Sequence, residues 1–202
     1  MDNKTIMFII SAVIALSGWI TLLYNWFTST PRIKGQILNI MTSSWPSPAF
    51  KTGLFVYLYL VNTRKNPTHI LDYELEIDFG HGYERAARVY RLQNIAAPIF
   101  ASEMLEITIP DFHEKLIYSK NAPSEYGIPL HGFAVFASSI TQEALMNINV
   151  KYRLTCIDAF GNRHVIKSTP KQFVNLFLLQ DIAGINIKDK KTDKINGQQI
   201  SG

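Results

Sequence analysis

Hydrophobic positions follow two different periods along the chain, and the change between them lies near residue 31. The first run, Thr5–Phe27, holds 23 largely apolar residues without one charged side chain. At a helical rise of ~1.5 Å per residue it reaches about 34 Å, enough to cross a hydrocarbon core of ~30 Å. Tyr24 and Trp26 fall near its end, where aromatic side chains gather at membrane interfaces. The pattern predicts a transmembrane anchor over residues 1–31.

A cleaved signal peptide is the competing interpretation of this run. Lys4 could be its charged start, and Ala15 and Ser17 could be the small residues of a cleavage site. The apolar run continues ten residues past Ser17, however, which a cleaved peptide does not need. We therefore expect an uncleaved single-pass membrane protein, as in a bacterial inner membrane. The charges on the two flanks are too similar to orient it, so the side on which the domain lies stays open.

After residue 31 the period changes to two. Strands are predicted over residues 32–40, 53–62, 69–79, 84–92, 103–109, 131–138, 147–157 and 164–168. The run 53–62 is apolar throughout and rich in aromatic and β-branched residues, which indicates a central strand covered on both faces. About eight strands with short turns, and no helical period between them, predict a mainly β fold. We expect an antiparallel sandwich of the immunoglobulin or fibronectin type over residues 32–168.

The segment LDYELEIDF, residues 71–79, alternates apolar and acidic residues without a fault. Its apolar side chains are predicted to be buried: Leu71, Tyr73, Leu75, Ile77 and Phe79. Its carboxylates are predicted to face solvent: Asp72, Glu74, Glu76 and Asp78. Residues two apart on a strand are ~6.6–6.8 Å apart, so neighbouring carboxylates cannot share a proton. An open strand face also lacks the cleft of an acid/base pair and the loop of a calcium site. We expect cross-strand cations, Lys151 and Arg153, to balance this row.

The order of these segments carries a resemblance. A membrane helix is followed by VNTRKNPTHILDYELEI (61–77), GIPLHGFAVF (127–136) and YRLTCIDAFGN (152–162). This arrangement is similar to uncharacterised single-pass bacterial membrane proteins. The resemblance implies an outer immunoglobulin-like sandwich, and it implies no activity.

Composition narrows the functional classes. Between residues 32 and 184 there are 15 Lys and Arg against 13 Asp and Glu, a difference of only +2, so no concentrated basic face for nucleic acid is expected. The single cysteine, Cys156, cannot form an internal disulfide and is expected to be a small buried hydrophobe. The histidines lack zinc-ligand spacing. We therefore predict no catalytic residue, no cofactor and no metal site.

Residues 169–184, TPKQFVNLFLLQDIAG, predict a short C-terminal helix. Thr169 and Gln172 form a capping box, Pro170 suits the first turn, and Gly184 can end the helix. A last strand over residues 172–179 is the alternative. A helix that is apolar all round needs cover on more than one side. The candidate interaction surface, for lipid or another protein, is Phe173, Leu176, Phe177, Leu179 and Ile182. Residues 185–202 are polar and are predicted to be a flexible tail.

These patterns favour a membrane-anchored binding or assembly module with an unknown protein partner over an enzyme. Two alternatives stay open. One is an accessory subunit of a membrane complex that docks through the anchor and residues 173–182. The other is a hydrolase whose catalytic residues meet only in three dimensions.

Overall fold

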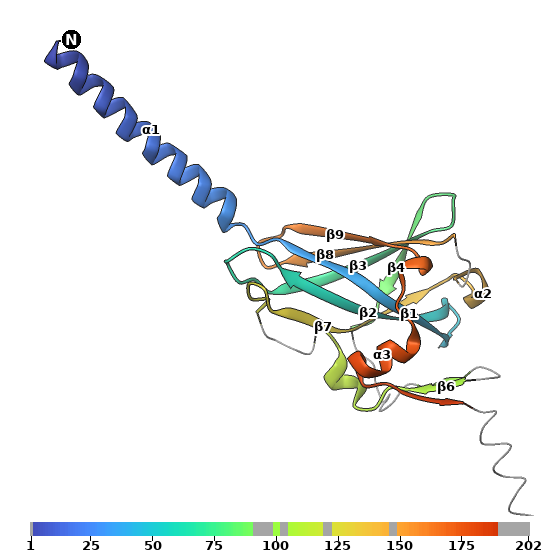
Figure 1. Ribbon diagram of the computed structural model, residues 1–202. Coiled ribbons are helices and arrows are strands. Elements are labelled where there is room, and N and C mark those ends of the chain that lie inside the picture. Colours follow the sequence, from blue (N-terminus) through green and yellow to red (C-terminus); the bar gives the residue numbers. More distant parts are fainter. Residues whose placement is uncertain (1, 91–98, 102–104, 119–122, 146–148, 190–202) are drawn as a thin grey trace, which may run out of the picture.

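The computed structural model describes residues 2–90, 99–101, 105–118, 123–145 and 149–189. Helix α1 (Asn3–Ser29) projects as a single rod from one end of a β domain (Figure 1). By length and composition it could cross a membrane, and none of its side chains is buried. The predicted apolar N-terminal helix is therefore confirmed, while its retention as an anchor stays a prediction.

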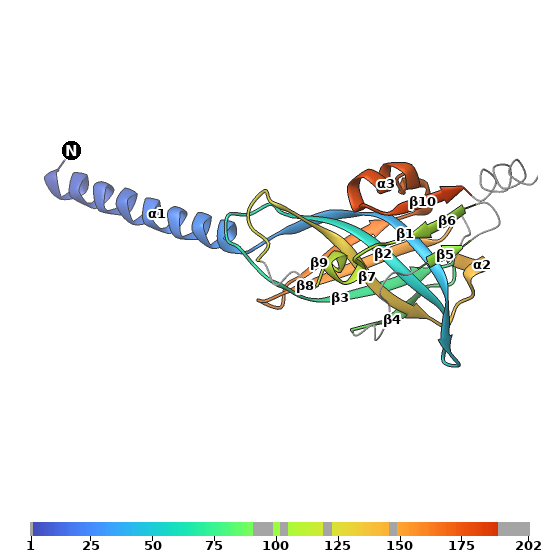
Figure 2. The same cartoon turned by 90° about the horizontal axis from the view of Figure 1, so that it is seen from below.

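Seven antiparallel strands form one sheet in the order β1-β2-β7-β4-β3-β8-β9. Their bounds are β1 Ile33–Ser47, β2 Phe50–Asn62, β3 Ile70–Asp78, β4 Tyr83–Arg88, β7 Pro129–Ser138, β8 Lys151–Asp158 and β9 Arg163–Ser168. Strand β4 joins the two halves, because residues 83–86 pair with β3 and residues 87–88 pair with β7. The sheet curls until β1 and β9 lie close together, but no ladder joins these two edge strands in the described residues (Figure 2).

The predicted fold class, mainly β and antiparallel, is confirmed by this arrangement. The finer assignment to an immunoglobulin-like sandwich stays a prediction. All seven strands belong to one curled sheet. The two halves form one continuous sheet because the six residues of β4 pair first with β3 and then with β7.

The inside of the curl holds the larger of two hydrophobic cores. On β2, Leu54, Val56 and Leu58 point into it, whereas Phe55 and Tyr57 point to the opposite face and belong to the second core. All five side chains are buried. The prediction that residues 53–62 form a strand covered on both faces is confirmed.

A second layer covers the outer face of β1, β2 and β7 (Figures 1 and 2). It contains the small sheet β10-β6-β5, the 3-10 helix η1 and the helix α3. Their bounds are β5 Ile99–Ala101, β6 Leu105–Thr108, η1 Phe112–Lys115, α3 Leu176–Ala183 and β10 Asn186–Asp189. Phe55 packs against Phe100 and Phe112, with ring centroids 4.8 and 5.6 Å apart. Two further short helices are α2 (Gln142–Leu145) and η2 (Pro170–Gln172).

The chain between β6 and β7 contributes to this second layer. Phe112 and Leu116 are buried in it, and the Ile117 N–H donates to the Phe133 carbonyl at 2.9 Å. Gly132 permits this approach, because a Cβ there would lie 2.6 Å from the Lys115 carbonyl oxygen. This connection between two strands is therefore partly core.

The apolar side of the alternating strand β3 follows its predicted pattern except at its start, whereas its four carboxylates are half-buried and not open to solvent as predicted. Tyr73, Leu75 and Ile77 are buried, and Phe79 packs half-buried against the same core. The prediction for Leu71 is wrong, since this side chain is 63% exposed. A bulge between residues 70 and 72 shifts the phase of the strand, so that Ile70 packs against the core instead.

The predicted helix over residues 169–184 is shorter than expected. The capping box at Thr169 closes only one 3-10 turn, the helix η2. Val174 then donates to the Leu38 carbonyl of β1 at 2.8 Å, which holds the chain out of helical geometry. A new N-cap at Asn175 starts α3, and Gly184 ends it in a left-handed conformation (φ 59°), as predicted. The strand alternative for residues 172–179 is wrong.

The prediction of a flexible tail is wrong for residues 185–189. Ile185 is buried, and β10 pairs with β6 in a four-residue antiparallel ladder. Ile185 and the half-buried Ile187 alternate with polar neighbours, which gives this short segment a strand period. Residues 190–202 of the predicted tail lie outside the described residues, as does Ile148 at the start of the predicted strand 147–157.

Candidate functional site

Every carboxylate of the acidic row on β3 has a cationic partner. Glu76 accepts from Arg153 of β8 at 2.6 Å (Nε) and 2.9 Å (a terminal nitrogen). Asp78 lies 4.0 Å from the Lys151 ammonium. The other pairs are Glu74–Arg85, Glu74–Arg163 and Asp72–Arg88. The predicted partners Lys151 and Arg153 are confirmed, and the row is a ladder of ion pairs on the outer face of the sheet.

Hydrogen bonds favour the ionised form of two of these carboxylates, Glu76 and Asp78. The Arg153 hydrogen bonds hold the pKa of Glu76 below its usual value. The Gly80 N–H, at 2.7 Å, and the Gly82 N–H, at 3.2 Å, lower the pKa of Asp78. A general acid or base instead needs a pKa close to the working pH. Glu76 and Asp78 do not meet this requirement, and the ion pairs of all four carboxylates fit a structural role.

Arg88 sits in a cage of tyrosine rings at the junction of the sheet halves. Its guanidinium carbon lies 5.3 Å from the ring centre of Tyr73, 4.5 Å from that of Tyr90 and 5.2 Å from that of Tyr118. Its charge is balanced by Asp72, and its Nε is buried without an acceptor in the described part of the chain. A cavity of about 350 Å³ adjoins the cage. Arg88 lies on β4 and pairs with Asp72 of β3, so the arrangement joins these two strands.

The turn between β8 and β9 is built around a buried carboxylate. Asp158 accepts from the Phe160 N–H and from the backbone and side chain of Asn162, all at 2.9 or 3.0 Å. The His164 Nε2 lies 3.0 Å from it, and the His164 Nδ1 accepts from the Ile33 N–H at 3.3 Å. Burial opposes ionisation of Asp158, but these hydrogen bonds together lower its pKa. The cluster ties β9 to the start of β1.

Metal and thiol chemistry find no support in the described residues. No group of three or more His, Cys, Asp or Glu side chains is placed there to hold a metal ion. Cys156 is buried, and burial raises the pKa of its thiol to about 12. The prediction that this cysteine is a small core hydrophobe is confirmed.

The strongest candidate site is a groove where β1 leaves the curled sheet open. Its volume is about 470 Å³. Residues 39–44 of β1 form one wall, and α2, the η2–α3 segment and the small sheet form the others. The apolar lining includes Phe100, Ile107, Leu145, Tyr152, Phe173 and Leu176.

The backbone of β1 supplies the polar wall of this groove. The Gln142 amide donates to the Thr42 carbonyl at 3.3 Å, so the Thr42 backbone points away from β2. Residues two apart on an antiparallel strand direct their backbone groups to the same side, so Ile40 and Ser44 face the groove as well. In the described part of the chain no strand pairs with this side of β1. We call the stretch from Ile40 to Ser44 the open edge.

The predicted interaction residues of the C-terminal segment fall in three places. Phe173 and Leu176 are half-buried and line the groove. Phe177, 61% exposed, and Ile182 lie on the outer side of α3. Leu179 is fully buried in the second core, so it cannot contact a partner while α3 stays docked.

The open edge itself was missed by the sequence analysis. The predicted first strand ended at residue 40, because the following MTSSWPSP has no hydrophobic period and looks like a loop. In the structure β1 continues to Ser47, since its ladder with β2 extends through this polar stretch. The neighbouring strand, not the local sequence, makes these residues extended.

Comparisons with known proteins add little to this geometry. No family model matches the chain, and no curated protein matches it. Among solved structures, the chain is similar to YcdA, a candidate lipoprotein of Bacillus subtilis, with 13% sequence identity and a TM-score of 0.41. The similarity covers 71% of this chain and 39% of YcdA, so the chain spans well under two thirds of that protein's length. At this TM-score we base no argument on the likeness.

Proposed function

We propose that this protein is a membrane-anchored binding module, and that its groove takes an extended apolar peptide segment of a partner protein. Helix α1 holds the domain at the membrane, and the curled sheet gives the groove a rigid frame. One observation carries the proposal: the open edge of β1 borders an apolar groove.

Strand addition explains why these two features occur together. An unpaired strand edge presents N–H and C=O groups that an extended peptide can match, while pockets beside it select alternate side chains. The open edge covers five residues, which at ~3.3 Å per residue gives a strand length of about 13 Å. The groove volume lies within the range of ~300–1,000 Å³ that is usual for binding pockets. Among the described residues its lining carries no charged side chain, which favours an apolar segment.

The alternatives differ in how well they fit. If the partner belongs to a membrane complex, the same binding function would make this protein an accessory subunit of that complex. A hydrolase has less support, because His164 and Asp158 bond to each other and to backbone groups inside a turn. In the described residues no nucleophile is bonded to this pair.

Site-specific photo-crosslinking in native membranes tests the proposal. A photoreactive residue at Ser43, inside the groove, should give one defined adduct, and the crosslinked peptide should come from an extended segment. The same residue at the exposed Lys167, on β9, is the matched control and should give none.

A proline at the open edge gives a sharper version of this test. Thr42→Pro removes an N–H that faces the groove and keeps the ladder with β2, because proline is tolerated on the open side of an edge strand. We expect the adduct to disappear and the melting temperature to change little. Equal adducts at both positions, or an adduct that survives Thr42→Pro, would contradict strand addition.

A further inference from the structure

Three loops meet the end of α1 on the side of the domain opposite the β1–β2 hairpin (Figure 1). They are residues 63–69 between β2 and β3, residues 123–128 before β7, and residues 159–162 between β8 and β9. Together with the linker, residues 30–32, we call them the membrane-proximal face.

The first of these loops is bonded directly to the last turn of α1. The Arg64 guanidinium donates to the Phe27 carbonyl at 2.9 Å, and the Asn66 amide donates to the Ser29 carbonyl at 2.8 Å. These carbonyls have no partner within the helix, so the loop caps it. Phe27 ends the apolar run next to Trp26, so Arg64 lies at the depth of the predicted membrane interface.

The three loops are also bonded to one another. Thr68 and Ser124 exchange two backbone hydrogen bonds, at 3.2 and 2.6 Å. The Ala159 N–H donates to the His69 carbonyl at 2.8 Å. The membrane-proximal face is therefore one connected surface, and its distance from the helix end is set by the structure.

Large apolar side chains project from the tips of this surface. Phe160 is 68% exposed, and Tyr126 and Ile128 are more than half exposed. Aromatic side chains with one apolar and one polar part suit the headgroup region of a bilayer. The opposite end of the domain is the tip of the β1–β2 hairpin, where Phe50 and Lys51 lie.

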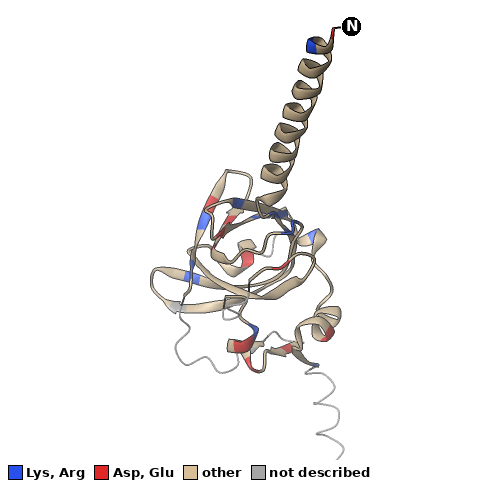
Figure 3. Ribbon diagram, turned by 90° about the vertical axis from the view of Figure 1, so that its left-hand side faces the viewer, with Lys and Arg blue, Asp and Glu red and all other residues tan. Residues whose placement is uncertain are grey.

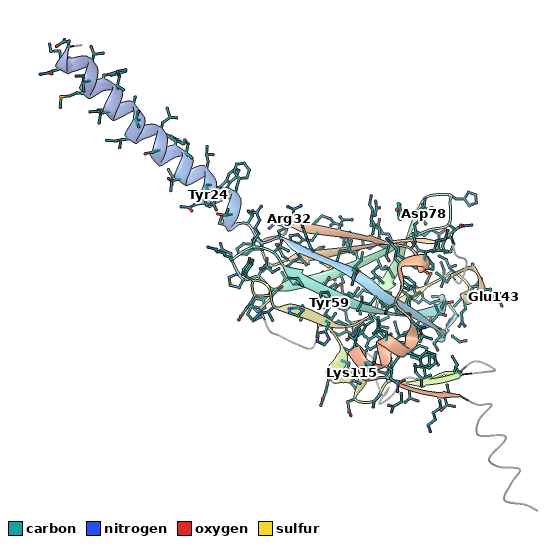
Figure 4. The ribbon with its side chains drawn as sticks, viewed as in Figure 1. Tyr24, Arg32, Tyr59, Asp78, Lys115 and Glu143 are labelled. Carbon is teal, nitrogen blue, oxygen red and sulfur yellow. The ribbon has the colours of Figure 1, made fainter. Side chains whose placement is uncertain are left out.

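The charges at this face have one prevailing sign. In the described residues, Arg32, Arg64 and Lys65 belong to it, and Lys34 and Arg163 adjoin it. Glu125 is the exposed carboxylate among them. Figure 3 views the domain from this side and shows Lys and Arg close to the base of α1. Figure 4 places Tyr24 and Arg32 at this end, and Asp78 and Glu143 at the far end.

We infer that the membrane-proximal face lies on the surface of an anionic bilayer, where Lys34 and Lys65 meet phospholipid headgroups and Phe160 and Tyr126 enter the interface. The inference rests on the proposed function in one respect, since α1 must stay in the membrane. Such contact fixes the tilt of the domain, so that the groove opens sideways at a constant height above the bilayer. Anionic lipid then controls how the binding site is presented.

Depth-dependent fluorescence quenching with the full chain in vesicles tests this inference. A fluorophore is attached at Tyr126→Cys, and quenching by nitroxide-labelled headgroups is compared between phosphatidylcholine and a mixture with phosphatidylglycerol. Native Cys156 is buried and does not compete for the label. We expect strong quenching in the anionic mixture, and none for a label at Lys51→Cys on the far hairpin.

Charge reversal provides the decisive comparison. Lys34→Glu with Lys65→Glu should lower the ratio of docked to undocked domains by more than about tenfold in anionic vesicles. Lys167→Glu with Lys171→Glu makes the same change in net charge away from this face and should have no such effect. Flotation of the vesicles separates the two proposals. A chain that does not float overturns both the anchor and the docking, whereas a floating chain with equal quenching in both lipids overturns the docking alone.

Discussion

The acidic row of β3 shows at the residue scale how a scaffold can look like a site. Four carboxylates in nine residues resemble a cluster of ligands, yet each one is bound by an arginine or lysine of a neighbouring strand. Their apolar neighbours Leu75 and Ile77 are fully buried. The stability of this strand should therefore come chiefly from its inner face.

Replacement of one residue on each face tests this difference. Leu75→Ala should cost ~2–5 kcal/mol, because it removes core contacts and leaves a cavity. Glu74→Gln should cost about 1 kcal/mol or less, since partly exposed ion pairs contribute little. Urea denaturation of both variants measures the two values. If Glu74→Gln instead abolished a binding activity while the fold stayed intact, the structural interpretation of the row would be wrong.

The lowered pKa of Glu76 predicts a pH dependence of stability. The folded state binds a proton at this carboxyl more weakly than the unfolded state, whose pKa is ~4.3. The contribution is therefore complete above that unfolded pKa, and it is lost as the pH falls through it towards the folded pKa. We expect the free energy of unfolding to decline below about pH 5. Glu76→Gln should make this decline shallower.

Arg153→Gln is the companion variant, because it removes the main cause of the pKa shift. Its pH profile should match that of Glu76→Gln in denaturant titrations. An unchanged slope in both variants would show that other carboxyls determine the acid response.

At the element scale, the candidate binding surfaces belong to two elements, the edge strand β1 and the helix α3. Strand β1 leaves part of its backbone open, and α3 leaves Phe177 and Leu178 exposed while Leu179 enters the core. The segment from Pro170 to Asn175 joins the two, because Val174 bonds to Leu38 of β1, beside the open edge, before α3 begins.

The exposed side of α3 gives the third prediction. Phe177→Ser with Leu178→Ser should change the melting temperature little, because neither side chain belongs to the described core. The pair should weaken association with a partner protein, measured by co-purification in mild detergent, because α1 keeps both the variant and the wild type in the membrane fraction. Leu179→Ser should instead lower the melting temperature strongly, since this residue is fully buried. A large loss of stability in the double variant would show that this side of α3 belongs to the core.

Elements whose own side chains decide their environment could be predicted from the sequence. Strand β2 is an example, because an uninterrupted apolar run needs cover on both faces. Phe173 and Leu176 of the groove were found for the same reason. The open edge was not, since its polar residues are held extended by the ladder with β2. The predicted burial of Leu71 was wrong because of the bulge. A bulge depends on how β3 pairs with β8, and the sequence of β3 alone does not specify that pairing.

At the scale of the whole molecule, one rod projects from one end of a curled sheet, and one covering layer lies on the outer face of β1, β2 and β7 (Figures 1 and 2). The rod ends against a basic, partly aromatic face, and the groove lies on the flank of the sheet beyond it. This arrangement can present the groove to a partner at the membrane only if α1 is not cleaved and stays in the bilayer. Anchoring then raises the local concentration of the groove for partners in the same bilayer.

A charge in the middle of α1 tests the membrane-spanning role. Ile14→Arg should cost ~2.5–3.5 kcal/mol of insertion free energy, as expected for arginine at a helix centre. A glycosylation-reporter assay of insertion measures this cost. Lys4→Arg, near the start of α1, is a conservative control and should insert like the wild type. Equal insertion of Ile14→Arg and the wild type would contradict a spanning helix.

The most direct measurement is peptide mapping of the mature protein after fractionation of cells. We predict that the protein stays with the membranes through alkaline washing and is released by detergent. Peptides from Thr5–Phe27 should be recovered with it, joined to the domain. A mature chain that begins after Ser17 and is found in the soluble fraction would contradict the account.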